Sequence, residues 1–498
     1  MRLSKRIKAF FSKQSSRAST VFHHRSPFFR HSSSVMDNFP PELICQVFRL
    51  AVEDASSTDI SALLAISGTC KKWRTISTDD SQLWARINLS FTSLASDLSR
   101  AVAFLLRSKR YPLTICLDLR DPFWDFDEDN HRFGWQDMEA MMRMLVIHAD
   151  RWRSFTLLTD TWSPIFTFLW YSRHVTSMPL LETLSLSRCN IFLAAAGQTF
   201  QPLALRQPIS LFGGILPDAL RRVSFVGVHI DWDSASLKNL EHLELKYIVS
   251  DVAPTIVQLQ RIFDLSPNLN YLAIHGAIPR DLHDHSTSLD VQISLSQLKS
   301  LSLGFLTPSD ATKLFSLLNL PQITEIVLDD ISAILTPDTI HDSTPLFQTL
   351  IDRQQFRFQD LQSLQLIGIR CDTKILTTFL GELHSISTLS LSNMPNDVLQ
   401  SLGILGAETR PIGPEYICQA LRKLHCQDAD PEVLIAVVRS RADHVGLQPL
   451  EKVSLEFARR PAPEFFSTVY KQLADLGIIV IQRMARASQF STAPSSFV

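Results

Sequence analysis

The sequence predicts an α/β chain, in which a short N-terminal bundle of three helices precedes an irregular solenoid of parallel strands and helices. Two observations predict this fold class. Apolar residues recur at helical spacing between residues 38 and 87, and a pattern apolar-x-x-apolar-x-apolar recurs from residue 152 onwards. At 498 residues the chain exceeds one compact domain. We expect a disordered basic tail (1–35), the helical bundle (36–90), linker helices with a first strand and an insertion (91–150), the solenoid (151–483) and a second disordered tail (484–498).

The composition is that of a globular protein, with 45% hydrophobic and 20% charged residues. A formal charge of −2 gives no electrostatic reason to expect nucleic-acid or membrane partners. The seven cysteines are scattered and no two have C-x-x-C spacing, which favours reduced thiols in a cytoplasmic or nuclear protein. Since no apolar run approaches the ~18 residues of a membrane span, we expect a soluble chain.

The first 35 residues differ from the rest of the chain, because they combine many serines with basic residues and contain no acidic residue. A solvated, disordered extension is one interpretation. A mitochondrial transit peptide and a contact with nucleic acid or an anionic membrane are others, and composition does not separate them. The basic residues are Arg2, Lys5, Arg6, Lys8, Lys13, Arg17, Arg25 and Arg30.

The predicted bundle begins at Asn38. A proline and then an acidic residue, in Pro40-Pro41-Glu42, suit the first turn of a helix, where a missing N–H costs nothing and a negative charge favours the dipole. Leu43, Ile44, Val47 and Phe48 follow on one helical face. A second helical segment holds Ile60, Leu63, Leu64 and Ile66, and a third holds Cys70, Trp73 and Ile76. So small a bundle buries little surface by itself, so we expect it to pack on a partner or on the next domain.

The order and spacing of these features resemble the F-box family. The matching features are the proline-led first helix, the late Cys70-Lys71-Lys72-Trp73 and the closing Leu83-Trp84. Two departures stand out: Phe39 replaces the leucine that usually precedes the first proline, and residues 53–59 lengthen the link between the first two helices.

The resemblance implies a function. F-box proteins bind a Skp1-type adaptor, which links them to a cullin and a RING subunit, while a downstream domain holds a protein substrate for ubiquitin transfer. Carried onto this sequence, the adaptor-contacting residues would be Pro40, Leu43, Ile44, Val47, Phe48, Leu64, Cys70 and Trp73. Some of them, Trp73 above all, have a second interpretation as internal core of the bundle.

The repeated pattern resembles an irregular leucine-rich repeat. Its starts are 20 to 39 residues apart, most often 29. The last two apolar positions share one face of a strand, and each strand must stack on its neighbours to bury that face. The pattern starts at Trp152, Leu181, Leu220, Leu240, Leu269, Leu298, Ile323, Leu361, Ile386, Leu421 and Leu450.

Helices are expected between the strands. Asp430-Pro431 gives an N-cap and a proline at the first helical position before residues 433–438. Residues 309–310 give a similar signal before 314–318, and residues 256–263 form a third candidate helix. A closing helix at 464–476 and a strand at 478–481 complete the predicted solenoid.

An insertion at 118–137 interleaves acidic residues with aromatic ones. One interpretation is that these rings form a hot spot for a basic partner. The interpretation that we favour is that they pack against the first repeats. The weak candidates for substrate binding are Phe123, Trp124, Phe126 and Trp135.

The chemistry of an enzyme is not evident. The sequence contains no G-x-S-x-G, P-loop, G-x-G-x-x-G, H-E-x-x-H or paired cysteines at zinc spacing. His283-Asp284-His285 is better interpreted as solvated than as a metal site, because adjacent ligands alone do not build a closed site. We therefore expect a non-catalytic receptor without metal or cofactor. Two alternatives stay open: an adaptor-bound scaffold that recruits no cullin, and a solenoid whose insertions hide a hydrolytic site.

Overall fold

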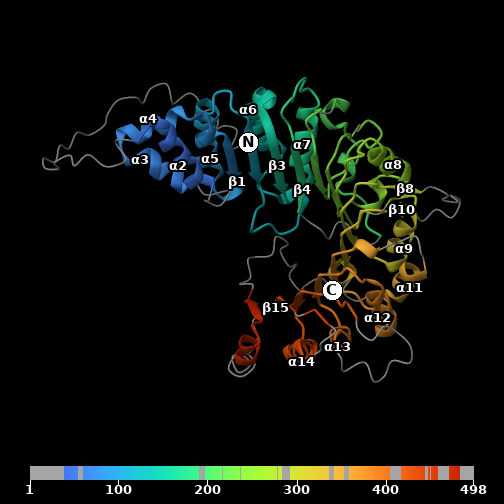
Figure 1. The fold of residues 1–498 in the computed structure, drawn as a ribbon. Coiled ribbons are helices and arrows are strands. Elements are labelled where there is room, and N and C mark those ends of the chain that lie inside the picture. The colour runs from blue at the N-terminus through green and yellow to red at the C-terminus, as the bar shows by residue number, and fades with distance from the viewer. Residues whose placement is uncertain are drawn as a thin grey trace. The chain divides into compact units, whose positions relative to one another are not determined.

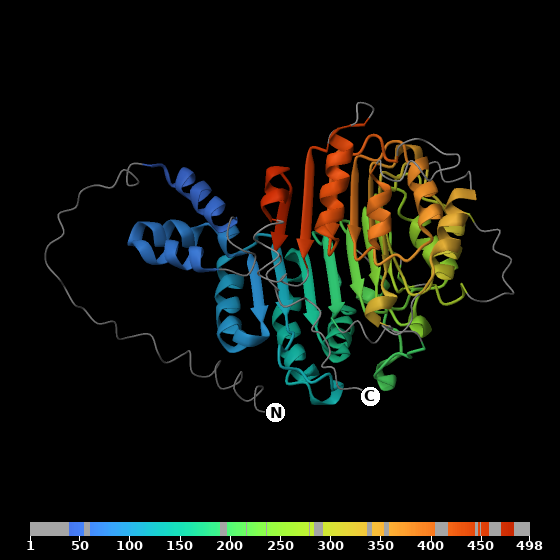
Figure 2. The same cartoon turned by 90° about the horizontal axis from the view of Figure 1, so that it is seen from below.

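The computed structural model describes residues 39–53, 60–189, 197–215, 217–235, 237–277, 279–282, 292–335, 341–352, 358–403, 417–443, 447–448, 450–457 and 470–482. The chain divides into two compact units. The first comprises Met1–Leu186 and Ile209–Leu220, and the second comprises Ser187–Pro208 and Arg221–Val498. Figures 1 and 2 show the elements of both units from two directions.

The first unit opens with the three predicted helices, which pack on one another. They are α2 (Pro41–Glu53), α3 (Ser61–Thr69) and α4 (Lys71–Asp79), and a short 3-10 helix η3 (Ser81–Trp84) comes after them. Pro41 stands at the first helical position of α2, where its missing N–H costs no hydrogen bond. The carbonyl of Pro40 starts the helix by accepting from the amides of Leu43 and Ile44 at 3.1 and 3.2 Å.

Parallel strands come next, in the order β1-β2-β3-β4. Their bounds are β1 (Arg86–Ser90), β2 (Leu113–Asp118), β3 (Trp152–Thr159) and β4 (Thr183–Arg188). The helices of this unit are η4 (Phe91–Ser93), α5 (Leu94–Arg107), η5 (Glu128–Asn130), α6 (Trp135–Leu145), η6 (Val146–Arg151), α7 (Trp162–Ser172) and η9 (Leu211–Gly214).

The second unit continues the strand–helix pattern in the order β5-β6-β7-β9-β11-β12-β13-β14-β15-β16, and every neighbouring pair is parallel. The strands are β5 (Arg222–Val226), β6 (His242–Lys246), β7 (Tyr271–His275), β9 (Ser300–Phe305), β11 (Glu325–Asp330), β12 (Ser363–Ile367), β13 (Thr388–Ser392), β14 (Lys423–Gln427), β15 (Lys452–Phe457) and β16 (Ile479–Gln482). A separate parallel pair joins β8 (Ile293–Ser294) to β10 (Leu318–Asn319).

Helices connect these strands, and Figure 1 shows α8, α9, α11 and α12 together on one side of the strands. Their bounds are η8 (Leu203–Leu205), η10 (Ser250–Val252), α8 (Ile256–Asp264), α9 (Pro308–Leu317), α10 (Ser332–Leu335), α11 (Thr344–Asp352), η11 (Phe358–Asp360), α12 (Thr373–Glu382), α13 (Asn396–Ser401) and α14 (Pro431–Ala442). The predicted α/β fold is confirmed: N-terminal helices are followed by parallel strands with helices.

The repeated apolar pattern works as the sequence predicted. In one repeat Leu240, Leu243 and Leu245 are all fully buried. Leu243 and Leu245 alternate along β6 and therefore face the same side, and Leu240 lies two residues before the strand. Each of the eleven predicted starts lies at or just before a described strand. The strand β1 was not predicted at its place, because its residue Ile87 matches the close of the helical motif.

The helix starts were predicted with mixed precision. Asp430 caps α14 by accepting from the amide of Glu432 at 2.9 Å, as expected. The cap of α9 is Thr307, which accepts from the amide of Asp310, and the helix therefore starts before the predicted signal at 309–310. Part of the predicted closing helix, residues 464–469, lies outside the described residues. In the described part, residues 470–475 are helical.

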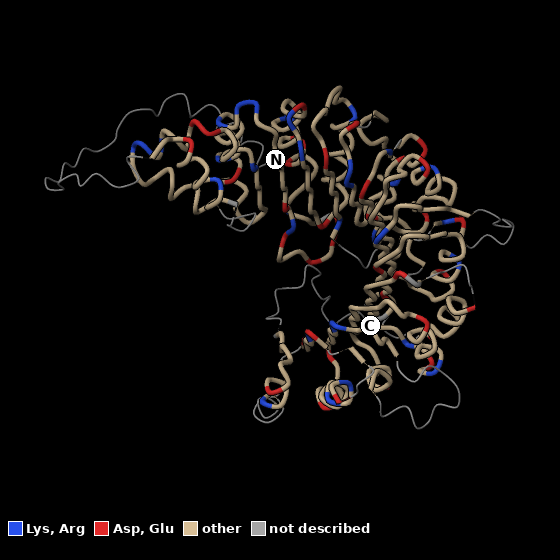
Figure 3. The backbone as a smooth tube through the Cα atoms, in the orientation of Figure 1, with Lys and Arg blue, Asp and Glu red and all other residues tan. Residues whose placement is uncertain are grey.

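Charges are dispersed over both units. Figure 3 shows acidic and basic residues interspersed along the described backbone, with no region given to one sign. Within the described ranges, no helix has both the length and the apolar character needed to cross a membrane.

Candidate functional site

One face of the helical bundle exposes large apolar side chains. Phe39, Leu43, Val47 and Leu50 are 43%, 44%, 50% and 62% exposed. Leu43, Val47 and Leu50 are spaced four and three residues apart, which places them along one stripe of α2, and Phe39 lies two residues before this helix. Leu64, on α3, is 49% exposed. Leu50 was absent from the predicted contacts, although its position on the stripe follows from the same helical spacing.

The adjoining stripe of α2, one residue further along the helix, forms the core of the bundle. Ile44 and Phe48 are only 1% and 2% exposed, and Phe48 packs its ring 4.9 Å from that of the half-buried Trp73. Two of the predicted contact residues, Ile44 and Phe48, therefore present almost no surface to another chain. The second interpretation, internal core, describes them best, because a residue on this stripe must face α3 and α4.

The Cys70-x-x-Trp73 spacing has a local cause. Cys70 is the N-cap of α4, and its Sγ accepts a hydrogen bond from the amide of Trp73 at 3.4 Å. The thiol itself is exposed. The spacing of three residues thus starts α4 and directs Trp73 towards Phe48.

Two buried groups join the bundle to the next elements of the chain, η3 and α5. Asp80 accepts two hydrogen bonds from the guanidinium of Arg49 at 2.9 and 3.0 Å, and one from the amide of Gln82 at 3.2 Å. Trp84 is fully buried, donates its indole N–H to the carbonyl of Ser77 at 2.6 Å and meets the ring of Phe104 edge-on. The closing Leu83-Trp84 therefore fastens the bundle to α5.

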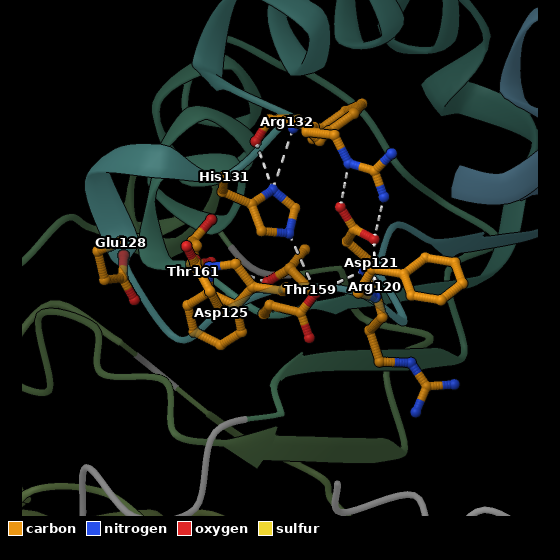
Figure 4. A network of polar contacts seen from close by, with 12 residues as sticks. Arg120, Asp121, Asp125, Glu128, His131, Arg132, Thr159 and Thr161 are labelled. Atoms are coloured by element: carbon orange, nitrogen blue, oxygen red, sulfur yellow. Dashed lines mark hydrogen bonds and ion pairs between the residues drawn. The ribbon is translucent and has the colours of Figure 1, made fainter. Parts of the chain in front are cut away.

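The acidic insertion is folded on its own polar network (Figure 4). The carboxylate of Asp121 pairs with the guanidinium of Arg132, which lowers the pKa of Asp121. The amide of Asp121 donates to the carboxylate of Asp160 at 2.6 Å, and Nε2 of His131 lies 3.1 Å from the same oxygen. Burial alone would lower the pKa of His131, but the hydrogen bond to Asp160 raises it above its ordinary value. Much of the insertion's charge is thus used internally.

The aromatic residues of the insertion divide into two groups. Trp124 and Phe126 are half-buried with ring centroids 5.1 Å apart, and the indole of Trp124 donates to the carbonyl of Asp127 at 2.8 Å. Phe123 and Trp135 are 86% and 54% exposed. Of these four rings, only those of the second group offer a large exposed surface.

The second unit has a polar surface on its strands, which we call the strand face. It consists of the side chains that alternate with the buried apolar ones along each strand. Its first row is the line of side chains from the first residue of each strand from β5 to β15 in the long sheet, which pair in register with one another. The first row is Arg222, His242, Tyr271, Ser300, Glu325, Ser363, Thr388, Lys423 and Lys452.

The strand face also holds two ionisable groups, the buried His275 and the half-buried Asp329. His275 lies with Nε2 2.7 Å from Oγ of Ser302 and with Nδ1 4.0 Å from a carboxylate oxygen of Asp329. Burial lowers the pKa of His275 to about 4 and raises that of Asp329 to about 7. Gly304 makes room for this imidazole, since a Cβ there would lie 2.6 Å from Nδ1 of His275. Ser302 lies in the middle of β9 and is only 7% exposed, so its contact with His275 is internal.

Metal-binding chemistry finds no support in the described part of the chain, where no group of three or more His, Cys, Asp or Glu side chains is placed to hold an ion. The histidines 283 and 285 lie outside the described residues.

Comparisons with known proteins give a family match and similar solved structures. Residues 36–90 match the F-box-like family model. No curated protein matches the chain. Among solved structures, the complex of Rad7 and Elc1 from yeast is similar at 13% identity and a TM-score of 0.38, over 84% of this chain and 90% of that one. The chain thus carries an F-box-like domain at residues 36–90, followed by a long series of parallel strands with helices.

Proposed function

We propose that this chain is the substrate-recognition subunit of an SCF-type ubiquitin ligase. The F-box-like domain binds a Skp1-like adaptor, which brings in a cullin and a RING subunit. The strands and helices downstream hold a protein substrate. The chain itself contributes binding and no catalysis.

The observation that carries the proposal is the exposed apolar stripe of α2. The three large apolar side chains of this stripe, Leu43, Val47 and Leu50, are costly to leave in water and are typical of a surface that a partner covers. They lie near the start of the segment that matches the F-box-like family, with the exposed Phe39 just before the helix. We assign the adaptor contact to this stripe and to Leu64, and we place Pro40 and Cys70 at the edges of the contact surface. We assign Ile44 and Phe48 to the core that holds α2 in place.

The experiment uses two variants of the full chain. Leu43→Asp combined with Val47→Asp places charge on the stripe without entering the core, and should abolish co-purification of Skp1. Ile147→Asp is the matched control, because Ile147 is an exposed apolar residue of the same unit, 74% exposed on η6. Unchanged recovery of Skp1 with the double variant would reject the assignment.

The same purification separates receptor from scaffold. Cullin in the native complex supports the ligase, whereas Skp1 without cullin supports an adaptor-bound scaffold.

Phe123 and Trp135 are candidates for substrate contact. Replacing both by alanine tests whether captured substrate is lost while Skp1 is retained.

A further inference from the structure

Within the proposed receptor function, on which this inference rests, we infer that the strand face of β11–β15 binds a substrate segment that carries a basic side chain and an acidic side chain a few residues apart. The segment crosses the strands rather than running along one of them.

The charges of the first row change sign from β11 to β15. Glu325 pairs in register with Ser363, Ser363 with Thr388, Thr388 with Lys423, and Lys423 with Lys452. The row therefore runs from one acidic residue across two hydroxyl residues to two basic ones. Since paired residues on parallel strands point the same way, these five side chains form one continuous line.

The charges at both ends of the line are accessible. Glu325, Lys423 and Lys452 are exposed, whereas Ser363 and Thr388 between them are half-buried. None of the three charged residues makes an ion pair with another residue in the described part of the chain. Two acidic residues near the basic end already have partners: Glu456 is buried with its carboxylate 3.6 Å from His425, and Glu451 pairs with Arg422.

The acidic end has a further feature that favours a cationic side chain. Two strands before Glu325, the half-buried Tyr271 stacks on His242 with ring centroids 4.0 Å apart and an interplanar angle of 2°. Only the small Ser300 stands between Tyr271 and Glu325 in the row. The side chain of an arginine or lysine whose backbone lies at Glu325 would extend over Ser300 and meet the carboxylate of Glu325 and the ring of Tyr271.

The spacing fixes the length of the segment. Neighbouring strands are about 4.8 Å apart, so Glu325 lies about 14 Å from Lys423 and about 19 Å from Lys452 along the row. An extended chain advances about 3.4 Å per residue. The two charges of the bound segment should therefore be about four to six positions apart.

Defined peptides test this geometry on the purified full chain. Each fluorescent, end-capped probe carries one arginine and one glutamate separated by zero to eight Gly/Ser residues. Anisotropy should show the tightest binding for spacers of about three to five residues, and weaker binding for probes in which glutamine replaces glutamate or arginine. Equal affinity at every spacer length, or no binding by any probe, would overturn the inference.

Charge reversal supplies the second arm. Glu325→Lys should weaken binding of the best probe at least about fivefold and improve binding of an all-glutamate probe, and Lys423→Glu should do the converse with an all-arginine probe. Matched controls are Glu382→Lys and Lys374→Glu on α12, which are exposed charges away from the strand face. Equal losses in the controls would show general electrostatics and reject the surface.

Skp1 binding separates this inference from the function on which it rests. The strand-face variants should retain Skp1 fully. Probe binding without Skp1 binding would reject the receptor and leave the strand face as an interaction surface. Skp1 binding without charge-dependent probe binding would reject the strand face alone.

Discussion

Two adjacent residues on α2 should have different effects when they are replaced by alanine: one should affect adaptor binding and the other the stability of the bundle. Leu43 is 44% exposed on the stripe that we assign to the adaptor, whereas Ile44 is 1% exposed in the core. Leu43→Ala should therefore weaken adaptor binding with little loss of stability, and Ile44→Ala should destabilise the bundle.

The magnitudes follow from exposure. Fully burying a leucine side chain is worth about 1.5–3 kcal/mol. An adaptor that covers the exposed 44% of Leu43 gains about 0.7–1.3 kcal/mol, so Leu43→Ala should raise the Kd of the adaptor about three- to ninefold. Its effect on stability should stay within about 0.5 kcal/mol. Ile44→Ala removes buried carbons and should lower the free energy of opening the bundle by about 2–5 kcal/mol.

Two measurements on the full chain check this contrast. Titration with purified Skp1 gives the Kd, and native-state hydrogen exchange of the amides in α2, α3 and α4 gives the free energy of local opening. An equal loss of amide protection in Leu43→Ala and Ile44→Ala, or an unchanged Kd of Leu43→Ala for Skp1, would refute the two roles assigned to these residues.

Three further changes test the fold. Asp80→Ala removes both hydrogen bonds from Arg49 and should lower the opening free energy of the bundle by about 1–3 kcal/mol, and unchanged hydrogen exchange would contradict this. Gly304→Ala places a Cβ 2.6 Å from Nδ1 of His275 and should cost about 1–3 kcal/mol in denaturant unfolding, with a smaller loss when His275→Ala is added. Asp329 has a pKa raised by burial from 3.8 to about 7, so the folded chain holds a proton that the unfolded chain releases, and stability falls as pH rises through this window. Asp329→Asn should consequently gain stability over the unchanged chain at pH 8 but not below pH 4, and an equal gain at both would contradict the assignment.

The sequence by itself determined the elements whose signals are local. The proline-led start of α2, the N-cap at Asp430 and the repeated apolar triplets each act within a few residues, and the structure has a helix or strand at all of them. The F-box resemblance was accessible for the same reason, because its features lie within one short segment.

Only the tertiary structure decided which side of each element faces outward. Leu43 and Ile44 are equally apolar neighbours in the sequence, and packing against α3 and α4 buries one and exposes the other. The line from Glu325 to Lys452 joins residues that are far apart in the chain, and strand register alone brings them together. Composition and local spacing carry no information on such pairing, because register depends on how whole repeats stack.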